Sequence, residues 1–401
     1  MKKRIIIFIL IIIVLIPIFF FGYKMYQNYQ EEMKIKNAKI VVQLKNNLKI
    51  RYDEKVTVND LIDNINGEVI GDYYLDTREI GKKKIEFKYI NEEEITIPYT
   101  IEYEVVDNVP PIIWLNDTYS IKVGTKGDLA TMIMSGDYYD DNPKREVIGE
   151  YDLNKIGNYK LTYRIVDKSG NETKKDFTLK VHNNPSNYKV NKKNFFDLKK
   201  KYKNDKTLIG LDVSKWQGNI DYSKVASSGI DFVMIKLGGT NGIGGEYYVD
   251  PKFKDNIEGF LEQGIPIGVY FYSYAKSVED AKREAGFVLS QIKDYNITFP
   301  IAFDWENWSS FNKFNISFKT LSETANAFIE TVEKEGYIGV LYSSKNYLEK
   351  IWNTMDNSVW LAHYTDKTDY KGDYVMWQLT SGGVIPGITE NTVDVDIMYL
   401  K

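Results

Sequence analysis

The chain has 401 residues, which is too long for one ordinary domain and predicts two or three. Its net charge of −4, with 27% charged residues, gives no basic excess of the kind that nucleic-acid-binding proteins carry. The absence of cysteine excludes disulfides, thiolate metal sites and a cysteine nucleophile, and two distant histidines, His182 and His363, argue against a histidine metal cluster or a Ser-His-Asp triad. Carboxylates are therefore the groups we expect to carry any chemistry.

An uncharged, apolar run from Ile5 to Gly22 follows three basic residues at the N-terminus. Its eighteen residues are just enough to cross a bilayer. The run is longer than the apolar core of a signal peptide, and no small-residue cleavage site follows it. We therefore predict that residues 1–30 are a short cytoplasmic stub and an uncleaved transmembrane anchor, with the rest of the chain outside the cell. The alternative is a cleaved signal peptide.

Short segments of alternating apolar and polar residues follow the anchor, as in Lys84–Ile90, and this alternation is typical of antiparallel sheets. The region also contains a repeat, because Leu75–Ile90 matches Tyr151–Val166 with the Ile-Gly pairs 76 residues apart. We predict two all-β immunoglobulin-like sandwich modules, residues 31–107 and 108–182.

The second module begins at Pro110 and Pro111 and resembles bacterial immunoglobulin-like surface domains. Its acidic turn residues Asp140 and Asp141, with Asn142 and Asp167, have the side chains that calcium sites use. Acidic turn residues more often form turns, so the sequence favours that interpretation, and we predict neither a metal nor a cofactor.

Residues 183–206 contain eight lysines against two aspartates, and we predict a basic linker there. A solvated tether is the simpler interpretation. The alternative is contact with anionic wall polymers or lipid headgroups.

From residue 207 to 401, strand-like apolar runs alternate with amphipathic segments, which predicts a parallel sheet closed into an α/β barrel. The amphipathic segments are Pro251–Gln263, Ser277–Asp294 and Leu321–Glu335. The predicted strands are 208–214, 232–238, 265–275, 299–306, 338–344, 359–364, 374–380 and 393–400. Because the last three strands have short connections, we expect fewer than eight complete βα units.

Carboxylates recur where these predicted strands end, which is where barrel active sites lie. Asp304 and Glu306 lie two residues apart on one strand, so their side chains point the same way. Burial and mutual repulsion push at least one of the two toward its protonated form, as acid/base catalysis requires. Asp212, Asp394 and Asp396 end or occupy two other strands. Aromatic residues lie near these acids in the sequence. Taken singly, each is more often a core residue than a sugar-binding one, but acids together with aromatic residues are typical of glycosidase sites.

The barrel region resembles glycoside hydrolase family 25, the muramidases often called Chalaropsis-type lysozymes. The motifs that carry the resemblance are LDVSKWQGNIDY, YVDPKF, GVYFYSYA, FDWE, WLAHY and WQLTSGGVIPGITENTVDVDI, between Leu208 and Tyr399. The resemblance implies a flattened α/β barrel with fewer helices than strands. It also implies hydrolysis of the β-1,4 bond from N-acetylmuramic acid to N-acetylglucosamine in peptidoglycan.

By the same resemblance Glu306 is the proton donor, and Asp304, Asp212 and Asp394 are the other catalytic acids. It implies that Asp304 and Asp212 stay ionised, where they orient the 2-acetamido group and stabilise positive charge, and we assign Asp396 to structure. The substrate-binding residues predicted with them are Tyr270, Tyr272, Trp216, Trp360, Tyr364, Trp377 and Gln378. The glycine-rich loop 238–245 lacks the Lys-Ser/Thr of a phosphate-binding loop and is not assigned to nucleotide.

Two functional classes remain. The first is a membrane-anchored extracellular peptidoglycan hydrolase of a Gram-positive bacterium, whose partners are glycan strands and the cell membrane. The alternative is a non-catalytic scaffold that binds wall glycan. Hydrolysis of another N-acetylated polysaccharide would keep the chemistry and change the substrate.

Overall fold

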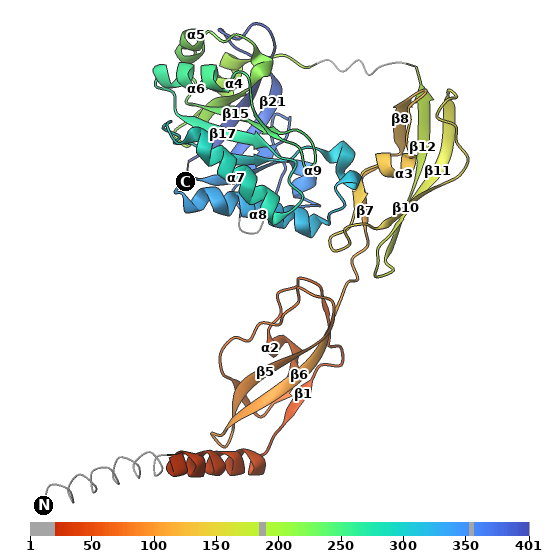
Figure 1. Ribbon diagram of the computed structural model, residues 1–401, viewed down its shortest axis with the longest axis vertical. Coiled ribbons are helices and arrows are strands. Elements are labelled where there is room, and N and C mark those ends of the chain that lie inside the picture. Colours follow the sequence, from red (N-terminus) through yellow and green to blue (C-terminus); the bar gives the residue numbers. More distant parts are fainter. Residues whose placement is uncertain (1–20, 184–189, 353–356, 401) are drawn as a thin grey trace, which may run out of the picture. The chain divides into compact units, whose positions relative to one another are not determined.

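The computed structural model describes residues 21–183, 190–352 and 357–400, and the chain falls into two compact units, Met1–Asn108 and Val109–Lys401 (Figure 1). Residues 21–37 are helical. Across the described ranges, no helix is both long enough and apolar enough to cross a membrane. The predicted anchor, Ile5–Gly22, lies outside those ranges except for its last two residues.

The N-terminal unit contains one all-β module. Its elements are β1 (Val42–Leu44), β2 (Lys49–Arg51), α2 (Val58–Leu61), β3 (Ile62–Ile65), β4 (Gly67–Val69), β5 (Gly81–Asn91) and β6 (Thr96–Val106). They form a four-stranded sheet, β2-β6-β5-β4, and a two-stranded sheet, β1-β3. Alternate residues of β5 and β6, such as Phe87, Tyr89 and Ile101, are buried, as the alternating pattern predicts.

A second all-β module begins the C-terminal unit and repeats the first, element for element. It contains β7 (Ile112–Ile113), β8 (Thr118–Lys122), α3 (Leu129–Met132), β9 (Ser135–Gly136), β10 (Lys144–Ile148), β11 (Gly157–Val166) and β12 (Glu172–His182). Its sheets are β10-β11-β12-β8 and β7-β9. In both modules the long hairpin is antiparallel and its second strand pairs in parallel with an early strand. The sequence repeat is thus a structural repeat, while the immunoglobulin-like assignment stays a prediction.

The rest of the C-terminal unit is an α/β barrel. Its strands are β14 (Thr207–Val213), β15 (Phe232–Thr240), β17 (Ile267–Tyr272), β18 (Ile301–Asp304), β19 (Gly339–Ser344), β20 (Val359–Ala362), β21 (Met376–Val384) and β22 (Val393–Tyr399), with β16 (Tyr247–Val249) paired to β15. Strands β14 to β21 pair in parallel in chain order, and β22 closes the barrel antiparallel to both β14 and β21. All eight predicted strands are present.

Helices cover the outside of the barrel up to β20 (Figure 1). They are η1 (Lys215–Gln217), α5 (Tyr222–Ser227), α6 (Phe253–Glu262), α7 (Val278–Ile292), η2 (Trp308–Lys313), α8 (Phe318–Lys334) and α9 (Lys345–Leu348). Ser277 and Ser317 cap α7 and α8 by accepting hydrogen bonds from backbone N–H groups of the first turn. The strands β20, β21 and β22 follow one another without a described helix between them, so the predicted shortage of helices is confirmed.

The structure corrects the predicted linker over part of its length. Residues 193–202 belong to the barrel, because β13 (Lys193–Asn194) pairs with β21 and α4 (Phe195–Tyr202) follows it. The side chains of Phe195 and Leu198 are buried in the barrel core. These residues are three positions apart on one helical face, so their burial holds the helix against the barrel.

A buried carboxyl, Glu284, joins α7 to the ends of two strands. Its side chain is 2% exposed and accepts hydrogen bonds from Thr240 Oγ1 (2.6 Å), Ser273 Oγ (2.5 Å) and the backbone N–H of Tyr274 (3.3 Å). Burial is the main cause that raises the pKa of Glu284 to about 7, although these hydrogen bonds oppose it.

This burial predicts that Glu284 makes the barrel less stable as pH rises. The folded state holds the Glu284 proton more tightly than the unfolded state, so stability is lost as pH increases from 4.5 through about 7. We expect Glu284→Gln to remove up to about 3 kcal/mol of this pH dependence, measured by urea unfolding at several pH values. Glu279→Gln, an exposed change in the same helix, is the control. An equal pH dependence in all three proteins would contradict the prediction.

Candidate active site

Four aspartates from three strands meet at one end of the barrel. Asp212 lies near the end of β14 and Asp304 is the last residue of β18. The register of β14 and β22 places Asp394 directly opposite Asp212, and Asp396 lies two residues further along β22. Asp212, Asp304 and Asp396 are 7%, 2% and 0% exposed, so these acids are crowded together away from solvent.

Burial and mutual repulsion raise the pKa of these carboxyl groups. The pKa of Asp212 rises to about 7, mainly through burial, although hydrogen bonds from Gln378 and Tyr270 oppose the rise. Burial, followed by the charge of Glu306, raises the pKa of Asp304 well above its usual value. Asp304 is therefore the member of the Asp304–Glu306 pair whose protonated form is favoured, and the raised pKa values of Asp304 and Asp212 run against the expectation that both stay ionised.

Gln378 holds Asp212 in place. Its Nε2 donates to Asp212 Oδ2 at 2.7 Å, and its Oε1 accepts from the hydroxyl groups of Tyr342 at 2.8 Å and Tyr364 at 2.9 Å. These bonds fix the orientation of the amide, because the oxygen must face the two tyrosine hydroxyls. The structure thus brings the predicted residues Gln378 and Tyr364 to the acids, together with Tyr342, which sequence reasoning missed.

Lys236 supplies a positive charge that sequence reasoning also missed. It lies on β15, with Nζ 4.7 Å from the ring centre of Tyr272 and 5.9 Å from that of Tyr270. Its charge acts to lower the pKa of both Asp212 and Asp304. A lysine inside the buried run FVMIKLG was the available signal, since a charge in a buried strand needs partners.

Glu306 lies just beyond β18 and is exposed, unlike its neighbour Asp304. It lines a cleft of about 390 Å³. The other lining residues are Trp305, Trp308, Tyr342, Ser343, Ser344, Lys345, Asn346, Tyr347, Ala362, His363 and Tyr364. The rings of Trp308 and Tyr347 stack with their centres 3.8 Å apart. Neither aromatic was predicted as a site residue, because each lies beyond its strand, Trp308 at the start of η2 and Tyr347 in α9.

The predicted aromatic residues divide between the site and the core. Tyr270 and Tyr272 lie with the acids, whose charges raise the pKa of both hydroxyl groups in addition to burial. Trp216 lies in η1 and is 65% exposed, and Asn391 Nδ2 donates to its backbone carbonyl at 2.7 Å. Trp360 is 1% exposed and donates from Nε1 to Asp396 Oδ1 at 2.8 Å, so it lies beneath the acids and gives Asp396 a structural partner.

Trp377 does not belong to the acidic cluster. It is 3% exposed, its Nε1 donates to the backbone carbonyl of His363, and its ring meets that of Tyr202 edge-on at 5.7 Å. Neighbouring side chains on a strand point to opposite faces, so the inward Gln378 requires an outward Trp377. Its prediction as a substrate-binding residue is therefore corrected.

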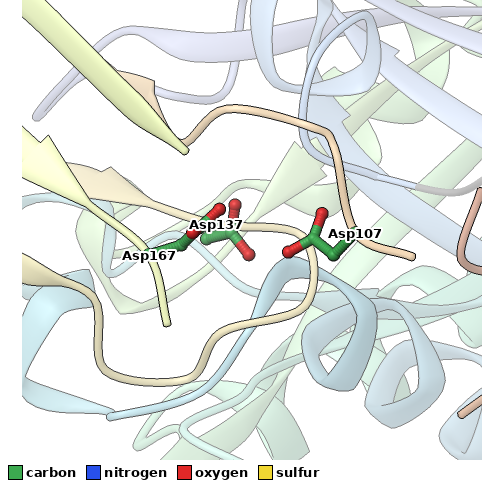
Figure 2. Close-up of side chains that lie close together, drawn as sticks. All are labelled: Asp107, Asp137 and Asp167. Carbon is green, nitrogen blue, oxygen red and sulfur yellow. The ribbon is translucent and has the colours of Figure 1, made fainter. Parts of the chain in front are cut away.

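Asp140, in the acidic turn of the second module, has a structural role. Its Oδ1 accepts from the backbone N–H of Asn142 at 3.0 Å and its Oδ2 from that of Lys168 at 2.7 Å, which are turn-forming bonds. In the same module, Asp137 and Asp167 each have one carboxyl oxygen within 4.8 Å of the other. Figure 2 shows this pair, and it also labels a third aspartate, which belongs to the N-terminal unit.

The position of Lys236 predicts the titration of the two acids that it faces. We expect Lys236→Met to raise the pKa of both Asp212 and Asp304, because it removes a positive charge and keeps most of the apolar stem. Carbon-13 NMR of labelled aspartate carboxyl groups measures the shift. Lys252→Met, which breaks an ion pair with Asp255, is the control. Unchanged titration of both acids in Lys236→Met would show that the lysine does not face them in solution.

Comparison with known proteins places this arrangement in a family. The model of glycosyl hydrolases family 25 matches residues 211–388. An autolytic lysozyme of Clostridium acetobutylicum is 27% identical over 190 residues, which cover 47% of this chain and 54% of that protein. The uncharacterized protein YegX of Escherichia coli O157:H7 is 29% identical over 196 residues, covering 48% and 69% of the two chains. This chain thus spans about half the length of the first of these relatives.

Among solved structures, the modular autolysin LytC from Streptococcus pneumoniae, in complex with a synthetic peptidoglycan ligand, aligns with a TM-score of 0.44 and 26% identity. The alignment covers 59% of this chain and 56% of that one. The matched residues include Asp212, Asp304 and Gln378. Residues 211–388 therefore form a glycosyl hydrolase family 25 domain in the C-terminal half of this chain.

Proposed function

We propose that this protein is a muramidase, which hydrolyses the β-1,4 bond between N-acetylmuramic acid and N-acetylglucosamine in peptidoglycan. The observation that carries the proposal is the position of Glu306, an exposed carboxyl on the wall of a cleft next to the buried acid Asp304. A carboxyl in this position can contact a bound sugar, and the neighbouring carboxyl of Asp304 can influence the proton that Glu306 donates. The family 25 match and the lysozyme among the relatives support the substrate class.

In the proposed reaction Glu306 protonates the glycosidic oxygen of the leaving sugar. Burial, followed by the charge of Glu306, raises the pKa of Asp304 well above its usual value, so Asp304 holds a proton next to Glu306. Glu306 is the member of the pair that faces the cleft, and so it is the one that delivers the proton.

The remaining acids are proposed to stabilise positive charge at the anomeric carbon. Asp212 is the best placed, because the Gln378 hydrogen bond favours its ionised form and its pKa of about 7 allows ionisation near neutrality. Asp394 lies opposite Asp212 across two paired strands, and burial and the charge of Asp212 raise its pKa well above its usual value, so Asp212 is the acid of this pair that carries the negative charge. Negative charge held in a water-poor site stabilises a developing oxocarbenium ion more strongly than it would in water.

Aromatic side chains around the cleft are proposed to bind the glycan strand. Trp308 and Tyr347 line the cleft beside Glu306, and Tyr364 and Trp216 are more than half exposed near the same end of the barrel. Sugar rings present flat apolar faces, so exposed aromatic rings offer them contact area at low entropic cost.

Substitution of Glu306 tests the proposal. We expect Glu306→Gln to lower kcat on purified peptidoglycan by about 10²–10⁴-fold, because glutamine keeps the shape but has no proton to give. Reduction of the products followed by mass spectrometry identifies the new reducing end. Glu335→Gln, a change of an exposed carboxyl at the end of α8, is the matched control and should keep full activity.

Two results would contradict the proposal in different ways. Binding of peptidoglycan without cleavage by the unsubstituted protein would favour the alternative of a wall-glycan-binding scaffold. Cleavage that leaves a reducing end other than N-acetylmuramic acid would keep a glycosidase and replace the substrate bond.

We also propose that the protein is held at the outer face of the cell membrane, with the barrel toward the wall. The support is the sequence alone, namely the apolar run Ile5–Gly22 behind three basic residues. Protease added to intact wall-free cells should then degrade the barrel while a cytoplasmic marker survives, and the barrel should sediment with membranes. Protection of the barrel from the protease would refute this orientation.

A further inference from the structure

The second all-β module packs against the chain segment that follows Glu306. This segment begins with η2, which connects β18 to α8, and the backbone N–H of Trp308 donates to the Glu306 carbonyl at 2.8 Å. The start of α8 is also held, because the backbone N–H groups of Phe318 and Lys319 donate to carbonyl groups of the module's residues 137 and 138. The loop that carries the proposed acid therefore lies between the barrel and the module.

Asn312 of η2 is the polar link across this contact. It is 9% exposed, and its Oδ1 accepts from the backbone N–H of Ser135 at 3.2 Å. Its Nδ2 donates to the carbonyl groups of Ile133 at 2.8 Å and Thr131 at 3.1 Å. All three partners are main-chain atoms of the module, so the amide fixes η2 to the module backbone. Removing it would leave buried polar groups without partners, which is costly.

Gly136 makes the apolar part of the contact close. A Cβ atom at this position would lie 2.7 Å from Phe311 Cε1 and 2.7 Å from Phe318 Cζ, so the two rings pack directly on the glycine backbone. Phe311 in turn meets the ring of Trp305 at 5.9 Å, and Trp305 precedes Glu306. Packing thus runs without a gap from the module to the residue beside the proposed acid.

A second set of aromatic contacts reaches the cleft itself. Trp114 of the module meets Tyr347 with ring centres 4.8 Å apart, and Tyr347 stacks on Trp308 at 3.8 Å. Trp308 completes the series by meeting Trp305 edge-on at 4.6 Å. Since Tyr347 and Trp308 both line the cleft, the module supports its wall from behind.

The module side of the contact is itself held firmly. Tyr163 is fully buried, and its hydroxyl bonds with Ser135 Oγ at 2.8 Å and donates to the Ala130 carbonyl at 2.7 Å. Arg145 adds bonds to Ser135, from Nε to Oγ at 3.1 Å and from Nη2 to the carbonyl at 3.2 Å. A surface fixed by three side chains in this way can transmit its position to η2.

We propose that the second all-β module is part of the catalytic site, and that Asn312 and Gly136 are positioning residues that hold the Glu306 loop in its working geometry. The proposal rests on the proposed muramidase function for its kinetic consequence. Its structural consequence, order in the loop, does not depend on that function. A module that served only to space the barrel from the membrane would need none of these contacts.

The test uses the full chain with Asn312→Ala and Gly136→Ala. We expect each variant to lower kcat about 10- to 100-fold with less than about threefold change in KM, because a shift of about 1 Å in a catalytic group costs that much. We also expect faster hydrogen exchange in peptides covering residues 305–318, measured by mass spectrometry. Asn91→Ala is the matched control, since Asn91 is a buried asparagine whose side chain accepts backbone bonds from Glu93 and Ile95 in the other unit.

The outcomes separate the two ideas. Wild-type kcat and unchanged exchange in both folded variants would overturn the positioning role, whether or not the protein is a muramidase. Faster exchange at 305–318 in a protein that cleaves no peptidoglycan would uphold the positioning role and remove the muramidase function. A fall in kcat of the same size in Asn91→Ala would show that general destabilisation, rather than the contact with η2, is the cause, and would also overturn the inference.

Discussion

The burial of several carboxyl groups at one end of the barrel is the constraint on which the rest of this structure depends. An ionised carboxylate in an apolar interior is costly unless it is paired or hydrogen-bonded, and here four aspartates compete for few partners. Side chains from four different strands reduce that cost by hydrogen bonds or by opposite charge, namely Gln378, Tyr270, Trp360 and Lys236. The acids thus determine which polar side chains line this end of the barrel. These partners offset only part of the cost of burying the carboxylates, so the pKa values of the acids stay raised.

The direction of the last strand explains how Asp394 reaches this cluster. In parallel strands the mouth of the barrel lies at the carboxyl ends, where Asp212 and Asp304 are found. Strand β22 is antiparallel to both of its neighbours, so its beginning, not its end, lies at the mouth. An acid at the second position of β22 can therefore face an acid near the end of β14. A regular eight-fold βα barrel could not bring residues at these strand positions together.

Much of the fold follows from the sequence because strand and helix periods are local properties. The eight barrel strands and the long hairpins of both modules could be predicted from runs and alternation. The site could be predicted from the strands for residues such as Asp212, Asp304 and Gln378, and from the family resemblance where a residue lies beyond its strand, as Glu306 does. Trp377 was misassigned because alternation along a strand shows that adjacent side chains point to opposite faces, but it does not show which of the two points into the barrel. The helix α4 was missed because its many lysines led us to predict a basic linker, although two apolar side chains, Phe195 and Leu198, anchor the helix in the barrel core.

The duplicated modules show why the contact with the Glu306 loop could not be predicted at all. The stretch that reveals the repeat contains the start of the long hairpin, β5 in one module and β11 in the other. The contact instead uses α3 and β9, which lie outside that stretch. Gly136 is central to this contact, because Phe311 and Phe318 pack directly on its backbone from more than 170 positions further along the chain. Repetition can conserve a scaffold because local pairing defines it, whereas a docking surface is defined by a partner that the repeat does not contain. Two modules with the same order of elements can therefore have different roles.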